Sequence, residues 1–284
     1  MVKRFLRKRV FKIGLTAGVL LLLSSFSKKE IVWVTIGDSI TYLNEHLNET
    51  GDRVTKGYQT RVKEKLGAIT YYNQGHNGWT AVGIAKEFDK LGVQKGDVYS
   101  IFLGTNDWWS GLPLGNLNDY KEDTGLKTVC GAFRVIVNKI KLINPEAKII
   151  MITPMQRTDF VYLFDKKNNA WGSDKARNDQ FLSAFADAVV QIAKYEHFDI
   201  VDLYHKKEMA LKNLVYFKQL KDPGTGEYKN YSFPDFSTIP FNPADDYPYP
   251  AGSINVTYDG LHPSDKGYEI IANMLTKVLK KYLN

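Results

Sequence analysis

The chain has 284 residues, of which 44% are hydrophobic and 24% are charged, so it is long enough for a large domain with a full core. Its only cysteine, Cys130, excludes a disulfide framework and a cysteine-based metal site, and we expect a buried core thiol. The formal net charge is +7. Residues 1–27 carry six of the 38 Lys+Arg and none of the 31 Asp+Glu, so the rest carries 32 minus 31, or +1. This balance argues against a nucleic-acid partner.

The first 27 residues differ from the rest. Six basic side chains precede an apolar stretch over residues 13–23, and Ser24-Ser25-Phe26-Ser27 follows. A basic start, a short apolar stretch and small residues are typical of a secretory signal, whereas a spanning helix needs about 20 apolar residues. We therefore expect export to a periplasmic or extracellular location. An uncleaved membrane anchor is the alternative, and only that case would place the protein at a membrane.

Strand-like and helix-like segments alternate along residues 28–284, which we expect to form one domain. The expected strands cover residues 31–36, 69–73, 97–103, 148–152 and 199–203, and the expected helices cover 57–66, 79–90, 124–142, 174–195 and 264–282. Ser264 is expected to cap the last helix. This alternation predicts an α/β fold, a doubly wound parallel sheet with helices on both faces.

Three connections are long, and each leaves the carboxyl end of an expected strand: residues 104–123, 153–173 and 204–258. Loops of this length are uncommon unless they are functional or disordered, and disordered chains are poor in aromatic residues. All three connections are rich in aromatic residues. We therefore expect ordered walls or lids of a cleft. For the insertion at 204–258, the alternative is a small structural insert that packs on itself.

The tetrapeptide Gly37-Asp38-Ser39-Ile40 ends the first expected strand. Parallel sheets bind ligands just beyond the carboxyl ends of their strands, so Ser39 would face the crevice. A serine becomes a nucleophile only beside a base, normally a histidine, whose other nitrogen is held by an acid.

Two of the five histidines stand in Asp-x-x-His, as Asp202/His205 and as Asp259/His262. On a helical turn, residues three apart share a face, so either pair could supply a base with its orienting acid. His262 precedes a proline and the expected start of the last helix, whereas His205 runs into two lysines that favour a solvated position. We therefore predict that Ser39 lies within hydrogen-bonding reach of His262 and not of His205.

Two further strand ends offer donors for an oxyanion. Gly78 follows the second strand, and its freedom in φ and ψ would let its N–H turn into the crevice. Asn106 follows the third strand and has a side-chain amide. Taken singly, each residue could equally have only a turn-forming role, because glycine and asparagine are common in the turns that follow strands.

Four blocks together resemble the SGNH (GDSL) hydrolase family. They are Gly37-Asp38-Ser39-Ile40, Asn77-Gly78-Trp79-Thr80, Gly104-Thr105-Asn106-Asp107 and Asp259-Gly260-Leu261-His262-Pro263, in the family's order. The resemblance implies a three-layer α/β/α, flavodoxin-like fold. It also implies that Ser39 is the nucleophile, His262 the base and Asp259 the orienting acid. The Ser39 N–H, Gly78 and Asn106 would form the oxyanion hole.

The α/β-hydrolases also have their Ser, Asp and His in this chain order. Their nucleophile elbow is Gly-x-Ser-x-Gly, but here Thr41 stands at the fifth position. Asp259 and His262 are also only three residues apart. Both features argue against this fold.

We expect an exported serine esterase that hydrolyses carboxylic esters, with short acyl groups such as acetyl on a carbohydrate as substrates. Trp79, Trp108 and Trp109 are the candidate substrate-binding residues, since tryptophan can stack on sugar rings. The alternatives are a lipase or lysophospholipase, an acyltransferase, and an inactive carbohydrate-binding homologue. We expect neither a metal nor another cofactor, because no histidine pair has ligand spacing and no glycine-rich nucleotide loop is present.

Overall fold

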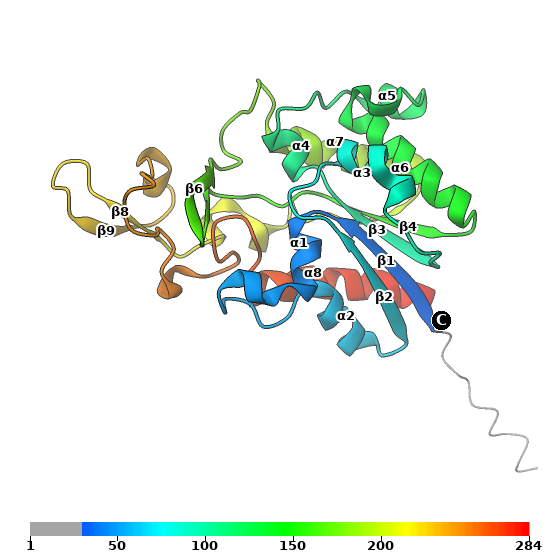
Figure 1. Ribbon diagram of the computed structural model, residues 1–284, viewed down its shortest axis with the longest axis horizontal. Coiled ribbons are helices and arrows are strands. Elements are labelled where there is room, and N and C mark those ends of the chain that lie inside the picture. Colours follow the sequence, from blue (N-terminus) through cyan, green and yellow to red (C-terminus); the bar gives the residue numbers. More distant parts are fainter. Residues whose placement is uncertain (1–29, 284) are drawn as a thin grey trace, which may run out of the picture.

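The computed structural model describes residues 30–283 (Figure 1). The leader expected at residues 1–27 lies outside the described residues. Among the residues that are described, none of the helices combines the length and the apolar character needed to cross a membrane.

Five parallel strands form the central sheet, in the order β2-β1-β3-β4-β7. They are β1 (Ile31–Gly37), β2 (Ile69–Gly75), β3 (Val98–Phe102), β4 (Lys148–Ile152) and β7 (Asp199–Val201). The chain reverses its direction of winding between β1 and β3, and ligands of doubly wound sheets bind at this switch point. The predicted fold is confirmed, and the expected strands match the observed ones within two residues at each end.

Alternating side chains of the strands feed two separate cores. In β3, Val98 and Phe102 pack on one face of the sheet, whereas Tyr99 and Ile101 pack on the other. This alternation follows from the two-residue period of a strand, and strands that are apolar on both sides belong in the middle of a sheet.

Helices cover both faces, as Figure 1 shows. One core is closed by α1 (Ser39–Tyr42), α2 (Tyr58–Leu66) and α8 (Asp265–Leu279), and the other by α3 (Ala81–Glu87), α6 (Val129–Ile143) and α7 (Leu182–Glu196). The short helices α4 (Thr105–Trp109) and α5 (Leu117–Lys121) follow β3. Cys130 is buried in α6, and burial raises the pKa of its thiol to about 12, as expected for a core cysteine.

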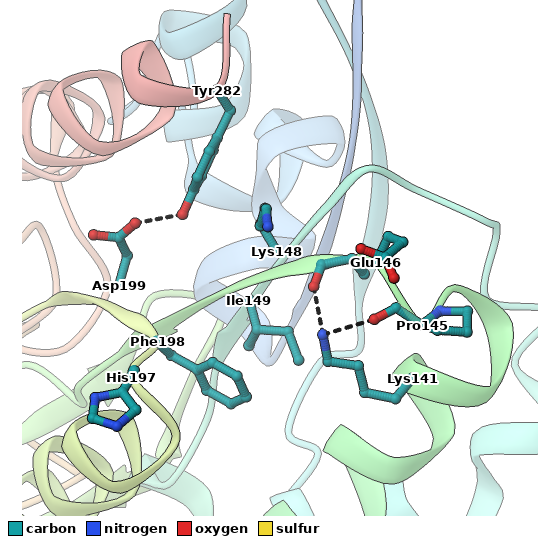
Figure 2. Close-up of a pocket in the computed structure, with 10 residues that line it drawn as sticks. Lys141, Pro145, Glu146, Lys148, Ile149, His197, Phe198, Asp199 and Tyr282 are labelled. Carbon is teal, nitrogen blue, oxygen red and sulfur yellow. Dashed lines mark hydrogen bonds between the residues drawn. The ribbon is translucent and has the colours of Figure 1, made fainter.

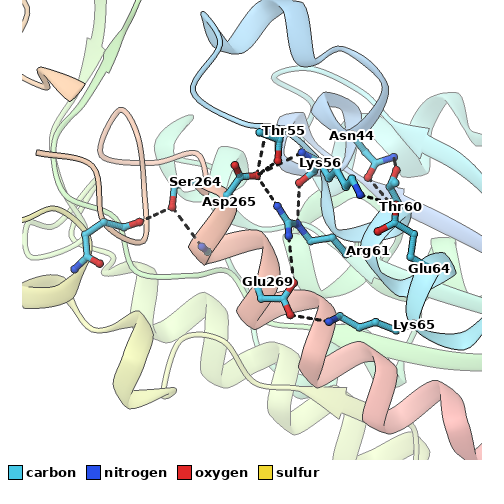
Figure 3. Close-up of polar contacts among 12 residues, drawn as sticks. Asn44, Thr55, Lys56, Thr60, Arg61, Glu64, Lys65, Ser264, Asp265 and Glu269 are labelled. Atoms are coloured by element: carbon cyan, nitrogen blue, oxygen red, sulfur yellow. Dashed lines mark hydrogen bonds and ion pairs between the residues drawn. The ribbon is translucent and has the colours of Figure 1, made fainter. Parts of the chain in front are cut away.

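Charged side chains join α2 to the start of α8 (Figure 3). Arg61 pairs with both Asp265 and Glu269, and the Asp265 carboxylate also accepts the Thr55 N–H at 3.0 Å. Ser264 is the N-cap of α8, as predicted, and accepts the Gly267 N–H at 3.4 Å. Exposed ion pairs add little stability each. Their consequence here is positional, because α8 begins three residues after His262.

Two expected helices begin later than predicted. The helix expected from residue 174 begins at Leu182, because Asn178 and Asp179 adopt positive φ in a tight turn that brings Arg177 and Gln180 together. The helix expected from residue 124 begins at Val129. Its N-cap is Thr128, whose hydroxyl accepts the Gly131 N–H at 3.1 Å. In both places turn or cap chemistry outweighs the continuing apolar periodicity.

The two later long connections each contain a hairpin, and both hairpins lie at the left of Figure 1. They are β5 (Phe160–Tyr162) with β6 (Asp165–Ala170), and β8 (Lys218–Lys221) with β9 (Tyr228–Tyr231). The 204–258 connection has a small core of Val215, Leu220, Phe236 and Tyr249, which also includes Val161 of β5. The connection therefore packs on itself, as in the alternative interpretation, and at the same time supports the segment before it.

Candidate active site

Ser39 begins α1 directly after β1. The Asp38 side chain caps this short helix and accepts the Ile40 N–H at 3.0 Å. Ser39 Oγ lies 2.9 Å from His262 Nε2, and His262 Nδ1 lies 2.7 Å from Asp259 Oδ2. Since a carboxylate only accepts, Nδ1 carries the proton and donates, which leaves Nε2 free to accept from the Ser39 hydroxyl.

The turn from Asp259 to His262 is held by its own carboxylate. Asp259 is fully buried, and its Oδ1 accepts the N–H groups of Leu261 at 3.0 Å and His262 at 2.7 Å. Gly260 has a φ of +90°, and a Cβ there would lie 2.1 Å from the Asp159 carbonyl oxygen. Only glycine fits this position, so the turn fixes the acid and the base in one geometry.

Aromatic side chains hold the imidazole ring of His262. The Tyr258 ring stacks on it with centroids 5.9 Å apart, and the Phe160 ring meets it edge-on at 5.5 Å. Phe160 comes from β5, in the second long connection. Sequence reasoning missed both residues. Nothing in the chain places residue 160 beside residue 262 before the fold is known, whereas Tyr258 stands only four residues before His262 and could have been noticed.

The other Asp-x-x-His pair lies elsewhere. His205 is exposed, with Nδ1 2.9 Å from Asp202 Oδ2 and Nε2 3.4 Å from Asp187 Oδ1. The prediction that Ser39 bonds to His262 and not to His205 is confirmed.

The two predicted oxyanion donors follow neighbouring strands. Gly78 has a φ of +77° and lies exposed after β2. Within residues 30–283, the N–H groups of Ser39 and Gly78 bond to no acceptor. The Asn106 amide nitrogen donates to the Trp79 carbonyl at 3.0 Å, which ties it to the residue after Gly78 and leaves its second hydrogen unused.

Two buried acids, Asp38 and Asp107, support these donors. Asp107 accepts the Ala81 N–H at 2.8 Å and the Val82 N–H at 3.3 Å, so α4 is fastened to the start of α3 beside Asn106. Burial raises the pKa of both acids to about 6. Sequence reasoning gave neither acid a role. A signal was present for Asp38, which directly follows β1 and caps the helix that begins there, whereas Asp107 lies inside α4 and reaches α3 only in the folded protein.

The three candidate substrate-binding tryptophans differ in burial. Trp108 has no exposed surface, and its Nε1 donates to the Gln180 carbonyl at 2.9 Å, so it packs in the core and cannot wall a cleft. Trp79 is partly buried and packs on the His76 ring at 4.9 Å. Trp109 is also partly buried. Only these two remain open to a substrate.

A separate pocket opens at the opposite, amino end of the strands, where β4 and β7 begin (Figure 2). Lys141 donates to the carbonyls of Pro145 and Ala147 there, and Asp199 pairs with Tyr282. Glu146, Lys148 and His197 also line this pocket, which lies at the far end of the strands from Ser39. Among residues 30–283, no group of three His, Cys, Asp or Glu is placed to hold a metal ion.

Comparison with known proteins agrees with the fold and the motifs. A solved structure described as a possible lipase from Chitinophaga pinensis is 58% identical, covers 89% of this chain and 99% of its own, and has a TM-score of 0.88. A protein from Lactobacillus plantarum is 17% identical over 89% of this chain and 98% of its own, with a TM-score of 0.60, and shows the fold alone. No curated protein matched the chain.

The family model that matches extends over residues 35–270, which includes Ser39, Gly78, Asn106 and the Asp259/His262 turn. The chain therefore belongs to the GDSL-like lipase/acylhydrolase family, and it is a hydrolase that acts on ester bonds.

Proposed function

We propose that this protein is an exported serine esterase that removes short acyl groups, chiefly acetyl, from carbohydrate esters. The observation that carries the catalytic part is the continuous chain of hydrogen bonds from Ser39 Oγ through His262 to Asp259. It stands at the carboxyl ends of the strands, beside the switch point of the sheet.

In the first half of the reaction, Ser39 Oγ attacks the ester carbonyl carbon while His262 Nε2 takes the hydroxyl proton. Asp259 holds the Nδ1–H and stabilises the imidazolium that forms. The negative charge on the carbonyl oxygen is met by the N–H groups of Ser39 and Gly78 and by the unused Asn106 amide hydrogen. The C–O bond to the alcohol then breaks, and His262 gives its proton to the leaving oxygen.

In the second half, a water molecule attacks the acyl group on Ser39, and His262 Nε2 takes the water proton. The same three donors stabilise the second tetrahedral intermediate. Its collapse breaks the bond to Ser39 Oγ, which recovers its proton from His262 and releases the carboxylic acid.

The substrate part of the proposal depends on Trp79 and Trp109. Both are partly exposed, and Trp109 lies on the same short helix as Asn106, so their rings can stack on a sugar beside the reacting ester. The proposal of export depends on the basic and apolar pattern of residues 1–27. A lipase or lysophospholipase, an acyltransferase and an inactive carbohydrate-binding homologue are the alternatives that the tests must separate.

The first test is turnover of 4-nitrophenyl acetate by the wild type and by Ser39→Ala. We expect the variant to lose activity by about 10⁴-fold or more. Equal turnover by the two proteins contradicts the proposal, and failure of both to cleave any ester supports the inactive homologue.

Further assays address the substrate. A series from acetate to palmitate should show the highest kcat/KM for acetate, whereas a maximum at long chains identifies a lipase. Acetylated xylose assayed with an added sugar acceptor should yield free acetate, whereas acetylated acceptor identifies an acyltransferase. Release of the expressed full-length protein into the periplasm or medium tests export.

A further inference from the structure

Three tryptophans and two arginines form a cluster beside the candidate active site. The Arg157 guanidinium carbon lies 5.5 Å from the Trp108 ring centroid and 5.2 Å from that of Trp109. The Arg177 guanidinium carbon lies 5.0 Å from Trp109 and 5.1 Å from Trp171. We call these five residues the tryptophan–arginine cluster. Trp109 is its centre, in contact with both cations.

The cluster borders the reacting groups. Trp109 follows Asn106 by three residues in α4, so the two side chains share a face of that helix. Trp109 also packs against the small apolar group of Phe160, Ala170 and Leu261. Leu261 directly precedes His262, and the Phe160 ring contacts the His262 ring. One layer of side chains therefore separates the cluster from His262.

The positive charge of the cluster is not neutralised by ion pairs. Within residues 30–283, neither Arg157 nor Arg177 forms a salt bridge. Asp159, which pairs with Lys218 at 2.8 Å, and Asp259, which holds neutral His262 at 2.7 Å, are the acids near Arg157, so the charges of Arg157 and Lys218 are balanced at longer range. Within the described residues, Arg177 is therefore the cation of the cluster that has neither a salt bridge nor a nearby buried acid.

Several donors of the cluster are also unused. Arg157 is 1% exposed, and its Nε and Nη2 are buried without a hydrogen-bond partner, as is the Trp171 Nε1. These buried donors lie behind the surface that a ligand would touch, so the contact to a ligand falls to Arg177. Arg177 is only partly buried, and its Nε donates to the Trp109 carbonyl at 3.0 Å, so its two Nη groups remain for a ligand.

The loop that carries Arg177 is fastened to the loop that follows Trp109. Gln180 donates to the Leu112 carbonyl at 3.0 Å and accepts the Leu114 N–H at 2.9 Å, and Asn178 donates to the Gly111 carbonyl at 3.1 Å. The guanidinium is thus held between two rings on a fixed loop. Such preorganisation reduces the entropy lost when a ligand binds.

We infer that the tryptophan–arginine cluster binds a carboxylate carried by the substrate, so that the preferred esters are those of acidic sugars such as uronic acids. Arg177 contacts the carboxylate through its Nη groups, which match the two oxygens in a bidentate pair. Buried Arg157 stacks behind Trp109 and holds it in place, and the exposed part of the tryptophan surface packs on the sugar ring. The inference rests on the proposed esterase function and specifies its substrate.

The alternative is that Arg177 only locks two loops together through stacking and its Nε bond. A structural role would affect charged and neutral ligands equally. The experiment therefore compares ligands that differ only in the carboxylate.

Binding is measured first, without turnover, in Ser39→Ala protein. Glucuronate and glucose are titrated separately against tryptophan fluorescence, since three of the five tryptophans belong to the cluster. We expect saturable quenching by glucuronate only, weakened by added salt, and a loss of affinity of about tenfold or more in Arg177→Gln. Equal affinities for glucuronate and glucose overturn the inference.

Arg134→Gln is the matched control, because Arg134 also lies on an aromatic ring, 5.2 Å from Tyr120, but is paired with Glu196 at 2.8 Å. We expect it to bind glucuronate like the parent protein. Arg157→Lys is a second variant that keeps the buried charge, and it should bind within about threefold of the parent, because Arg157 lies behind Trp109 and does not touch the ligand.

Turnover is measured next, with acetylated glucuronate and acetylated glucose. We expect Arg177→Gln to lose about tenfold more in kcat/KM for the acidic ester than for the neutral one, and Arg134→Gln to lose neither activity. An equal loss for both esters overturns the inference and leaves the esterase function standing. If the wild type cleaves neither ester while Ser39→Ala binds glucuronate, the proposed function fails and the carboxylate site stands.

Discussion

The chain contains two Asp-x-x-His turns, and only one of them lies beside a serine. In Asp202/His205 and in Asp259/His262, the histidine Nδ1 bonds to a carboxylate three residues earlier, at 2.9 and 2.7 Å. The side chains of the first pair are 34% and 49% exposed, whereas those of the second are 1% and 10% exposed. The remaining nitrogen faces Asp187 in one case and Ser39 in the other. The spacing of three residues therefore brings the acid and the histidine together in both turns. Burial beside the Ser39 hydroxyl is what makes His262 the candidate base.

The largest expected difference is between the two histidines. His262→Ala should lower kcat for 4-nitrophenyl acetate by about 10⁴-fold or more, because the Ser39 hydroxyl loses its proton acceptor. His205→Ala should stay within about twofold of wild type, because its ring touches no reacting group. Steady-state kinetics of the two purified variants check this. A comparable loss of kcat in both variants would contradict the assignment of His262, and not His205, as the base.

The two acids should differ next. Asp259→Asn is expected to reduce kcat by about 10³- to 10⁴-fold, because an amide in place of the carboxylate favours the wrong imidazole tautomer. Asp202→Asn should have no measurable effect on kcat. Rates are compared at several pH values, with circular dichroism to confirm that both variants are folded. Full activity of Asp259→Asn would contradict the orienting role.

A third test concerns Asp107, a buried acid that, unlike Asp259, has no histidine partner within the described residues. The Asp107 pKa is raised from 3.8 to about 6 by burial, so the folded state holds its proton more tightly than the unfolded state. Its stabilising contribution is complete below pH 3.8 and is lost as pH rises through about 6. A shift of about two units corresponds to about 3 kcal/mol, which Asp107→Asn should remove from the pH dependence of unfolding.

The measurement is urea unfolding of the wild type and Asp107→Asn at pH 4 and pH 7. From pH 4 to pH 7, the free energy of unfolding of the wild type should fall relative to that of the variant, by up to about 3 kcal/mol. The altered hydrogen bonds to Ala81 and Val82 are present at both pH values and cancel in the difference. Identical pH dependence in the two proteins would be evidence against a raised pKa.

The smallest expected effect concerns the turn itself. Gly260→Ala places a side chain at a φ of +90° and against the Asp159 carbonyl, whereas the corresponding position of the other pair holds Leu203 without positive φ. We expect a loss of about 1–3 kcal/mol in the free energy of unfolding, measured in urea. His262 should also shift, so kcat should fall. A variant as stable and active as wild type would mean that the glycine is not required.

Sequence patterns predicted what depends on neighbours along the chain. The apolar, β-branched segments became the five parallel strands, and Ser264 became the cap of α8. Ser39 and His262 were paired correctly because each stands beside a strong local signal, a strand end and a helix entrance. The predicted starts of two helices were wrong, because a turn at Asn178-Asp179 and a cap at Thr128 delay the helix although the apolar periodicity continues.

Contacts between distant segments could not be predicted in the same way. Trp108 and Trp109 are adjacent and identical in chemistry, yet one is fully buried and the other partly open. Nothing in the chain near Arg177 indicates that it lies between Trp109 and Trp171. Such contacts depend on how loops from different strands pack at one edge of the sheet.

By itself, the sequence determined the strands, the order of the reactive residues along the chain, and two local acid–histidine turns. Strand period and i, i+3 spacing are properties of a few consecutive residues, so they can be read without the fold. The tertiary structure alone decided which turn meets Ser39, which tryptophan is covered, and where, within residues 30–283, two arginines stack on tryptophans without a salt bridge. The physical reason is that burial and charge pairing depend on groups far apart in the chain, such as Trp108 and Gln180, separated by 72 residues, and Ser39 and His262, separated by 223.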